Sequence, residues 1–228
     1  MKVKFGAIVV DGRGKIGGHV ASKNRGGAYF RTKVTPTNPN STAQAGVRNR
    51  MTSLAQGWRG LSASARLSWN NAVGDFAKTD IFGDIKQPSG INLFTKLNSN
   101  LLEVGVAQLV NAPLPGSVSA VGSLSATAAA GSPAFSLVFT PTPVPAYTKF
   151  IVRATEQVSA GISNLSGKFR NIEILDPADT SPANILTSYN ARFGTLVAGR
   201  KIGVEVIPVN TVTGQKGQAV NYTVIVAA

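Results

Sequence analysis

The residues that could carry out chemistry are few and widely spaced in this sequence. Its 228 residues include one histidine, His19, and no cysteine. Without cysteine there are no disulfides, thiolate nucleophiles, iron–sulfur clusters or cysteine-type zinc sites. A lone histidine has no second histidine or cysteine to complete a metal shell, and it leaves few routes to a Ser–His–Asp triad. We therefore expect a structural or interface role for His19, and no catalytic residue, cofactor or metal site in this protein.

One glycine motif matches a nucleotide-binding pattern. The spacing G-x-G-x-x-G is met by Gly12, Gly14 and Gly17. A dinucleotide site also needs a helix directly after the glycines and an acidic residue about 20 positions later. A glycine pair and a β-branched, basic stretch follow here instead, and no acid lies between Asp11 and Asp75. We interpret the match as accidental.

A sparse group of carboxylates, Asp75, Asp80 and Asp84, is the remaining candidate site. These residues surround a predicted loop and could bind a cation weakly. Their spacing does not fit an EF-hand loop, which needs ligands at alternate positions and a closing glutamate.

Positive charge is concentrated at the start of the chain. The protein has 23 Lys and Arg against 10 Asp and Glu, a net charge of +13. Twelve of the basic residues but only one acid lie within residues 1–66, so that part carries +11 and the rest only +2. Such asymmetry favours an acidic or polyanionic partner, the alternative being a solvated basic surface. The candidate anchoring residues for a partner are Lys15, Lys23, Arg25, Tyr29, Arg31, Lys33, Arg48 and Arg50.

Residues 1–40 are predicted to form a basic, glycine-rich extended arm. Short strands are expected at 2–10, 19–22 and 28–34, separated by glycine turns. Pro36 and Pro39 then forbid a helix. Because such strands bury little apolar surface, we expect the arm to be ordered against the rest of the chain or against a neighbouring subunit.

Residues 41–112 are predicted to form a small helical region followed by a linker. Ser41 or Thr42 can cap a first helix, Ser62 or Ser64 a second, and Ser89 precedes a third that ends at Gly105. The apolar face of the first helix would contain Val47, Met51, Leu54, Ala55 and Trp58. Both tryptophans are expected to pack the helices together, and residues 106–116 have the composition of a linker.

Residues 113–228 have a β texture. Seven strands are expected, separated by Pro, Gly and Asn turns, at 117–127, 134–140, 149–157, 170–175, 185–192 (the weakest), 201–209 and 219–227. This pattern predicts an all-β immunoglobulin-like sandwich of the fibronectin-III kind. The fold class is therefore α+β and multidomain, with segments 1–40, 41–112 and 113–228. No apolar run approaches the length of a membrane span.

Nucleic-acid binding is the strongest rival interpretation of the charge. Basic residues alternate with Phe5, Tyr29 and Phe30, a composition that can neutralise phosphates and stack bases. No helix-turn-helix, zinc-finger or RRM signature accompanies it. Sequence-specific recognition is therefore not expected, and weak contact with DNA stays open.

Several segments within residues 12–105 resemble a family of bacteriophage and prophage virion proteins from viruses of Bacteroidetes-type hosts. They are GKIGG (14–18), KNRGGAYFR (23–31), TPTNPNSTAQAGVRNR (35–50), the pair Trp58 and Trp69, and SGINLFTKLN (89–98). The resemblance implies a structural component of the virion, made in the bacterial cytoplasm, whose partners are capsid, neck or tail subunits. It carries over no catalytic residue.

The combined expectation is a head-associated auxiliary or decoration protein. Its basic N-terminal region would anchor it, and an immunoglobulin-like module would project. A tail, neck or connector component is the first alternative, and a non-specific nucleic-acid-binding protein is the second. Homo-oligomerisation also stays open.

Overall fold

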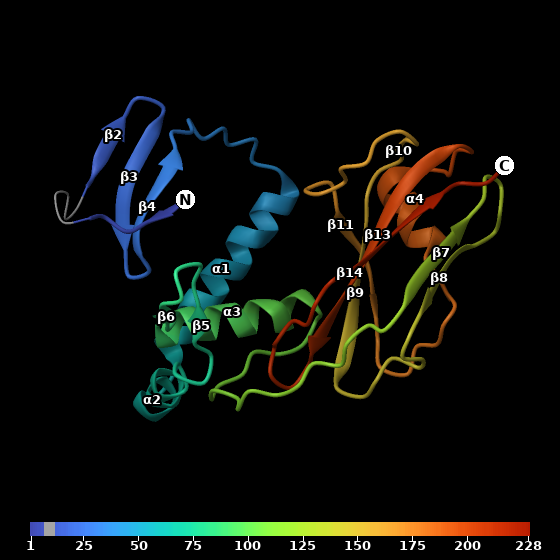
Figure 1. Cartoon of the computed structure of the whole chain (residues 1–228). Helices are drawn as coiled ribbons and strands as arrows, with labels where there is room; N and C mark the ends of the chain where they lie inside the picture. Colours follow the sequence, from blue (N-terminus) through green and yellow to red (C-terminus); the bar gives the residue numbers. More distant parts are fainter. Residues whose placement is uncertain (7–11) are drawn as a thin grey trace. The chain divides into compact units, whose positions relative to one another are not determined.

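The computed structural model describes residues 1–6 and 12–228, and in this part the chain forms four helices and several antiparallel sheets (Figure 1). This mixed content confirms the α+β expectation at a coarse level. The chain divides into two compact units. Unit 1 contains Met1–Asn49 and Ala77–Lys86, and unit 2 contains Arg50–Phe76 and Gln87–Ala228. The first helix, α1 (Thr42–Gly60), begins in unit 1 and ends in unit 2.

Unit 1 is built on a four-stranded antiparallel sheet. Its strands are β1 (Lys2–Val3), β2 (Gly14–Ile16), β3 (His19–Asn24) and β4 (Gly27–Thr32), in the order β1-β4-β3-β2 (Figure 1). The second and third predicted strands thus form close to their expected positions. Of the first predicted strand, 2–10, residues 2 and 3 form β1, and residues 7–10 lie outside the described part of the chain.

Tight glycine turns join the strands of this sheet. Ile16 pairs with His19, so only Gly17 and Gly18 connect β2 to β3. Gly17 has φ 55, a positive value that two-residue hairpin loops demand and glycine supplies at little cost. Gly14 and Gly17 therefore belong to a hairpin, and the segment after them is a strand where a dinucleotide site would need a helix.

A second, smaller hairpin completes unit 1. It consists of β5 (Lys78–Thr79) and β6 (Ile85–Lys86), which pair antiparallel. The sequence analysis predicted no strand here. Residues 33–41, which contain both prolines of the predicted arm, connect β4 to α1 without regular structure.

Three helices pack together in unit 2, as the sequence predicted. Helix α2 (Ala63–Asn71) is capped by Ser62, whose hydroxyl accepts from the N–H of Ala65. Helix α3 (Gly90–Glu103) is capped by Ser89. Their core is a cluster of large apolar side chains with aromatic contacts: Leu54, Trp69, Leu93, Phe94 and Leu97. The packing role predicted for the tryptophans is confirmed, because both rings lie against Phe94.

The predicted apolar face of α1 is only partly buried. Leu54 is fully buried, whereas Val47 and Met51 are 56% and 47% exposed. The predicted spacing places these residues on one face of α1, but the first half of that face is exposed. A helical period shows which side chains share a face, but it does not show how far along the helix a partner extends.

The rest of unit 2 contains two antiparallel sheets with a common core. One has the order β12-β8-β7, formed by Ala183–Asn184, Phe135–Phe139 and Leu124–Ala128. The other has β13 (Arg200–Asn210) at its centre, with β14 (Val220–Ile225) on one side and β9 (Thr148–Ala154), then β11 (Arg170–Leu175), on the other. The short β10 (Val158–Ser159) also pairs with β13. Lys201 of β13 has Ile225 of β14 on one side and Val158 of β10 on the other, so β10 lies on the same side of β13 as β9.

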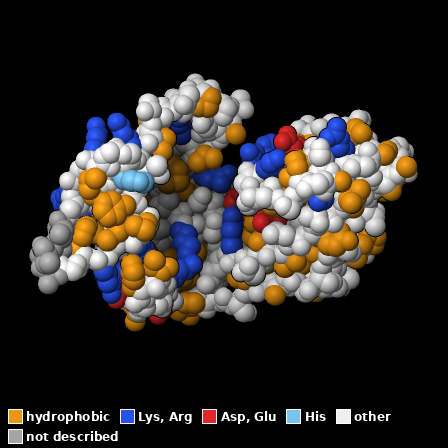
Figure 2. Space-filling model, turned by 45° about the horizontal axis from the view of Figure 1, so that its top comes forward, with side chains coloured by type: hydrophobic (Ala, Val, Ile, Leu, Met, Phe, Trp, Pro, Cys, Tyr) orange, Lys and Arg blue, Asp and Glu red, His pale blue; other side chains and the backbone are white. Residues whose placement is uncertain are grey.

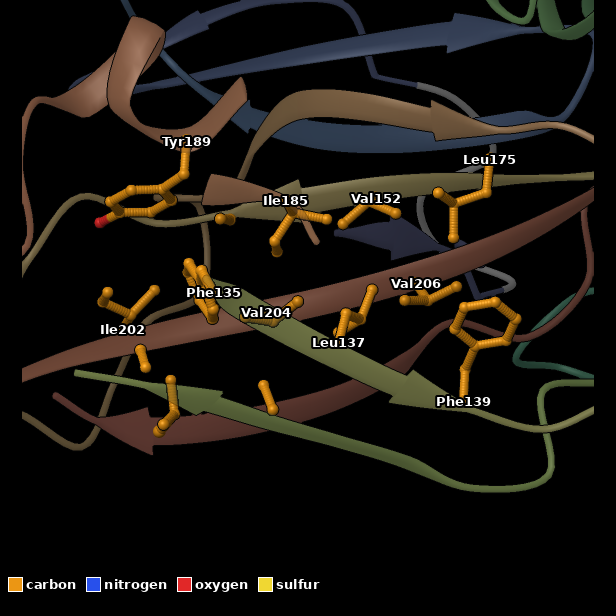
Figure 3. Packing of buried hydrophobic residues seen from close by; sticks show 14 of the residues in the cluster. Phe135, Leu137, Phe139, Val152, Leu175, Ile185, Tyr189, Ile202, Val204 and Val206 are labelled. Carbon is orange, nitrogen blue, oxygen red and sulfur yellow. The ribbon is translucent and has the colours of Figure 1, made fainter. Parts of the chain in front are cut away.

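Alternate residues of these strands fill the space between the sheets. Phe135, Leu137 and Phe139 of β8 point toward Val204 and Val206 of β13, and all five are fully buried (Figure 3). Period-two alternation of this kind identified most of the strands from sequence.

The weakest predicted strand, 185–192, is wrong, because this segment is helix α4 (Leu186–Phe193). Ile185 and Tyr189 are fully buried, and Leu186 and Phe193 pack partly buried against the same core. These spacings of three and four residues are typical of a helix face. Only the two residues of β12 before it pair with β8.

Helix α3 is fixed to the outer face of the larger sheet. Val104, just after the helix, packs with Ile151 of β9 and Val209 of β13. The Glu103 carboxylate accepts hydrogen bonds from Lys216 at 2.6 Å and from Asn171 at 2.7 Å. Burial opposes ionisation of Glu103, but these bonds and the charges of Lys216 and Arg50 hold its pKa below the ordinary value.

Hydrogen bonds also fix the predicted linker, 106–116. The N–H of Leu109 donates to Asn98, that of Ala112 to Ser68, and that of Gly116 to Gln215. The segment is therefore bound to the helices at one end and to the β-strand region at the other.

Candidate protein-docking surface

Strand alternation gives the sheet of unit 1 two chemically different faces. Lys15, Val20 and Arg31 lie in one cross-strand row, and Ile16, His19 and Thr32 lie in the next. Because successive side chains point to opposite faces, these rows face opposite ways. We call the two sides the cationic face, which carries Lys2, Lys15, Tyr29 and Arg31, and the apolar face, which carries Val3, Ile16, Ala21 and Phe30.

A hollow of about 630 Å³ lies beside Ile16 and Phe30 of the apolar face, and Arg31 of the cationic face also lines it. It is lined by Met1, Ile16, His19, Phe30, Arg31 and Thr32. Ile16 is 61% exposed, and Phe5 packs edge-on against Phe30 with ring centroids 6.3 Å apart. Figure 2 shows the single histidine beside hydrophobic side chains on the surface. Such an exposed apolar hollow is typical of a binding surface.

The acids of the small hairpin neutralise one group of lysines in unit 1. Lys2 pairs with Asp80 at 3.5 Å, and Lys4 pairs with Asp84 at 3.0 Å. Lys86 contacts both carboxylates, and the Lys4 amine lies 5.5 Å from the centre of the Phe82 ring. The hairpin therefore contacts Lys2 of β1 through Asp80, and Lys4, which follows β1, through Asp84 and Phe82.

Asp80 also organises the turn of this hairpin. Its Oδ1 accepts from the N–H of Phe82 at 2.8 Å and from that of Asp84 at 3.0 Å. Desolvation works against the charged form, but these two backbone bonds and the nearby Lys2 leave the pKa of Asp80 below its ordinary value. The carboxylate is thus held ionised in its contact with β1.

Four of the predicted anchoring cations in unit 1 make no side-chain hydrogen bond or ion pair in the described part of the chain. They are Lys15, Arg25, Arg31 and Lys33, all among the residues predicted from sequence to anchor a partner, and no described carboxylate lies within ion-pair distance of them. Lys15 and Arg31 share the cationic face with Tyr29, which is half-buried. Arg25 lies in the turn after β3, and Lys33 follows β4.

The other predicted anchoring residues have different positions. Arg48 donates to Asn38 at 2.7 Å and to Asn40 at 3.3 Å, so it fixes the segment before α1. Arg50 belongs to unit 2, where its charge acts on Glu103. Lys23 lies on β3 opposite Ala28.

The sequence analysis missed the apolar half of this surface. Ile16 was not singled out, and Phe30 was considered only as a residue that could stack on bases, although alternation within 14–16 and 27–32 places both opposite Lys15 and Arg31. It also missed the ion pairs of Asp80 and Asp84, because residues distant in sequence supply their lysines.

The arrangement is suited to binding. In the described residues no three His, Cys, Asp or Glu side chains gather as metal ligands would. Asp80 and Asp84, which were candidates for weak cation binding, contact lysines. No helix of the described chain combines the length and the apolar character that crossing a bilayer requires.

No known protein family, curated protein or solved structure matches this chain.

Proposed function

We propose that this chain is a structural protein of a bacteriophage virion, made in the bacterial cytoplasm, and that it is a head-associated auxiliary or decoration protein. Unit 1 anchors it to other virion subunits, and the two sheets of unit 2 form the projecting module. The observation that carries the proposal is the small sheet of unit 1, in which cations without acidic partners and an exposed apolar hollow occur together. A surface of this kind serves assembly better than catalysis.

The strand order of unit 2 supports an immunoglobulin-like module of the fibronectin-III kind. In such folds the strands A, B and E share one sheet, while C, F and G share the other and an extra strand C′ can extend it. Assigning β7, β8, β9, β11, β12, β13 and β14 to A, B, C, C′, E, F and G reproduces both sheets. Sandwiches of this type have no built-in chemistry and commonly act as adhesive or spacer modules.

Charge supports the assignment of the anchor to unit 1. Asp80 and Asp84 offset two of the three charges of Lys2, Lys4 and Lys86, and the side chains that lack acids add the rest of the positive potential. Complementary charge steers a subunit to its partner and fixes its orientation. An acidic patch on a capsid, neck or tail subunit would meet this requirement.

Charge reversal in an infected culture tests the anchor. In the double variant K15E/R31E, the copy number per particle should fall at least tenfold, measured by quantitative mass spectrometry of purified virions. The control R192E/R200E reverses two exposed cations of unit 2 and should keep the normal copy number. Normal incorporation of K15E/R31E would contradict the proposed anchor.

Copy number also separates the first alternative, a tail, neck or connector component. Hundreds of copies in each particle support the head assignment, whereas about a dozen indicate the neck or tail.

The second alternative is non-specific nucleic-acid binding, and it is favoured by one observation. Lys15, Tyr29 and Arg31 share a face, which offers phosphate contacts beside an aromatic ring. A binder making several phosphate contacts would lose its DNA affinity steeply between about 50 and 200 mM salt. Absence of DNA retention at 50 mM salt would exclude this alternative.

A further inference from the structure

We infer that strand β2 binds an extended segment of a partner protein in which acidic and apolar residues alternate. This inference rests on the proposed anchoring role of unit 1 and names the chemistry of its partner. The segment would add to the outer edge of β2, with its acidic side chains on the cationic face and its apolar side chains on the apolar face.

Strand β2 has an open edge. The strand lies at the end of the order β1-β4-β3-β2, and no strand of the described chain pairs with its outer side. All three of its residues are exposed. An exposed strand presents unpaired N–H and C=O groups, and an extended peptide can bind them by main-chain hydrogen bonds.

This edge borders two surfaces of different chemistry. Lys15 points to the cationic face, and Arg31 lies in the same row two strands away. Ile16 points to the other face, where it lines the hollow with His19 and Phe30. Since a bound strand also alternates with a period of two, its side chains must alternate between acidic and apolar to match both faces.

The small hairpin shows what the other edge of this sheet binds. Asp80 of the hairpin of β5 and β6 binds Lys2 of the opposite edge strand, β1, and its Asp84 and Phe82 contact Lys4, which follows that strand. Acidic and aromatic side chains in combination are therefore what the lysines of this sheet already bind. Lys15 and Arg31 have no such partner in the described residues, and a second segment of the same chemistry would supply it.

A synthetic peptide tests the inference with the full purified chain. The probe is a fluorescein-labelled peptide of sequence Gly-Glu-Val-Glu-Phe-Glu-Val-Gly, and binding is followed by fluorescence anisotropy at 50 mM salt. The variants K15A/R31A and I16A should each weaken binding at least fivefold, because one removes charge and the other removes apolar contact. The control R192A/R200A removes the same charge from unit 2 and should bind the peptide as the unmodified chain does. Circular dichroism of each variant checks that it is folded.

A second set of probes separates strand addition from simple charge attraction. The same peptide with N-methyl groups at alternate residues keeps its charge but loses the hydrogen bonds of one edge. Alternate N–H groups of the bound peptide point toward β2 or away from it. N-methylation of the set that points toward β2 should abolish binding, whereas N-methylation of the other set should be tolerated. Equal binding of both N-methylated peptides, or unchanged binding to K15A/R31A and I16A, would overturn the inference.

The remaining outcomes are equally decisive. If a 30-nucleotide single strand of DNA binds this face and displaces the peptide, with the same loss in K15A/R31A and none in I16A, the face is a nucleic-acid surface and the inference is wrong. Failure of the peptide together with loss of K15E/R31E from virions would overturn the inference and leave the proposed function standing. Peptide binding together with normal incorporation of K15E/R31E would support the binding of a strand at β2 and contradict the proposed anchoring function.

Discussion

The hydroxyl of Tyr189 in α4 donates a hydrogen bond to the carbonyl of Thr155, 3.1 Å away and directly after strand β9. The Thr155 side chain in turn accepts from the N–H of Gly203 on β13, at 2.9 Å. Tyr189 also packs edge-on against Phe135 of β8, with ring centroids 5.3 Å apart. One buried side chain thus connects α4 to both sheets of unit 2.

Removal of this hydroxyl should lower stability without disturbing the packing. In Y189F the carbonyl of Thr155 loses its partner in a buried position, and the free energy of unfolding should fall by about 1 kcal/mol in urea titrations. The control is Y147F, since Tyr147 is 70% exposed and its loss should change the stability by less than about 0.5 kcal/mol. Equal effects of the two substitutions would show that the Tyr189 bond contributes nothing.

The same residue should make the protein sensitive to alkali. Burial, with a smaller effect of the Glu156 charge, raises the pKa of Tyr189 above its ordinary value of 10.0. The unfolded chain therefore releases this proton at a lower pH than the folded chain, so the stability is complete below about pH 10 and falls as the pH rises above it. The loss is about 1.4 kcal/mol for each pH unit above 10, as long as the folded chain keeps the proton. The urea stability curves of the unmodified protein and of Y189F should cross between about pH 10 and 11, and parallel curves would contradict this.

A side chain at Gly203 on β13 should displace the side chains that pack over it. A Cβ atom there would lie 2.8 Å from Leu165 and 3.2 Å from Phe169, both on the loop that covers this strand. G203A should therefore destabilise unit 2 by about 1–3 kcal/mol, measured by urea unfolding. G161A is a matched control, because a Cβ at Gly161 meets no atom within 4 Å. A neutral G203A would mean that the loop moves away at no cost.

The turn of the small hairpin should depend on Asp80. In D80N the ion pair with Lys2 is lost and the bonds to the N–H groups of Phe82 and Asp84 weaken. Hydrogen exchange at these two amides should accelerate about threefold to tenfold, because the turn opens more often. D75N, at an exposed aspartate, should leave both rates unchanged. Unchanged exchange in D80N would contradict the role assigned to this carboxylate.

Composition and periodicity predicted most regular elements of unit 2. Strands such as β8 and β13 alternate large apolar with small or polar residues, and Ser62 and Ser89 cap helices that begin where expected. Helix α4 was taken for a strand because the segment is short, and in eight residues the helical and the extended patterns are hard to tell apart.

The surface of unit 1 could be predicted only in part. Charge counting identified Lys15 and Arg31 as candidates, since an excess of cations needs no knowledge of the fold. The hollow beside Ile16 depends on the register of β2 against β3, which the Gly17 turn sets. The pairing of Lys2 with Asp80 joins residues 78 positions apart, and no local pattern encodes it.

The fixed segment between α3 and the strands has a mechanical consequence. Val104 is wedged against Ile151 and Val209, and the backbone that follows is bonded on both sides as far as Gly116. This segment of unit 2 is therefore not a hinge between its helices and its strands. A displacement of the helices would be transmitted to the strands. The loops at the far ends of the strands would keep a fixed orientation relative to the helices.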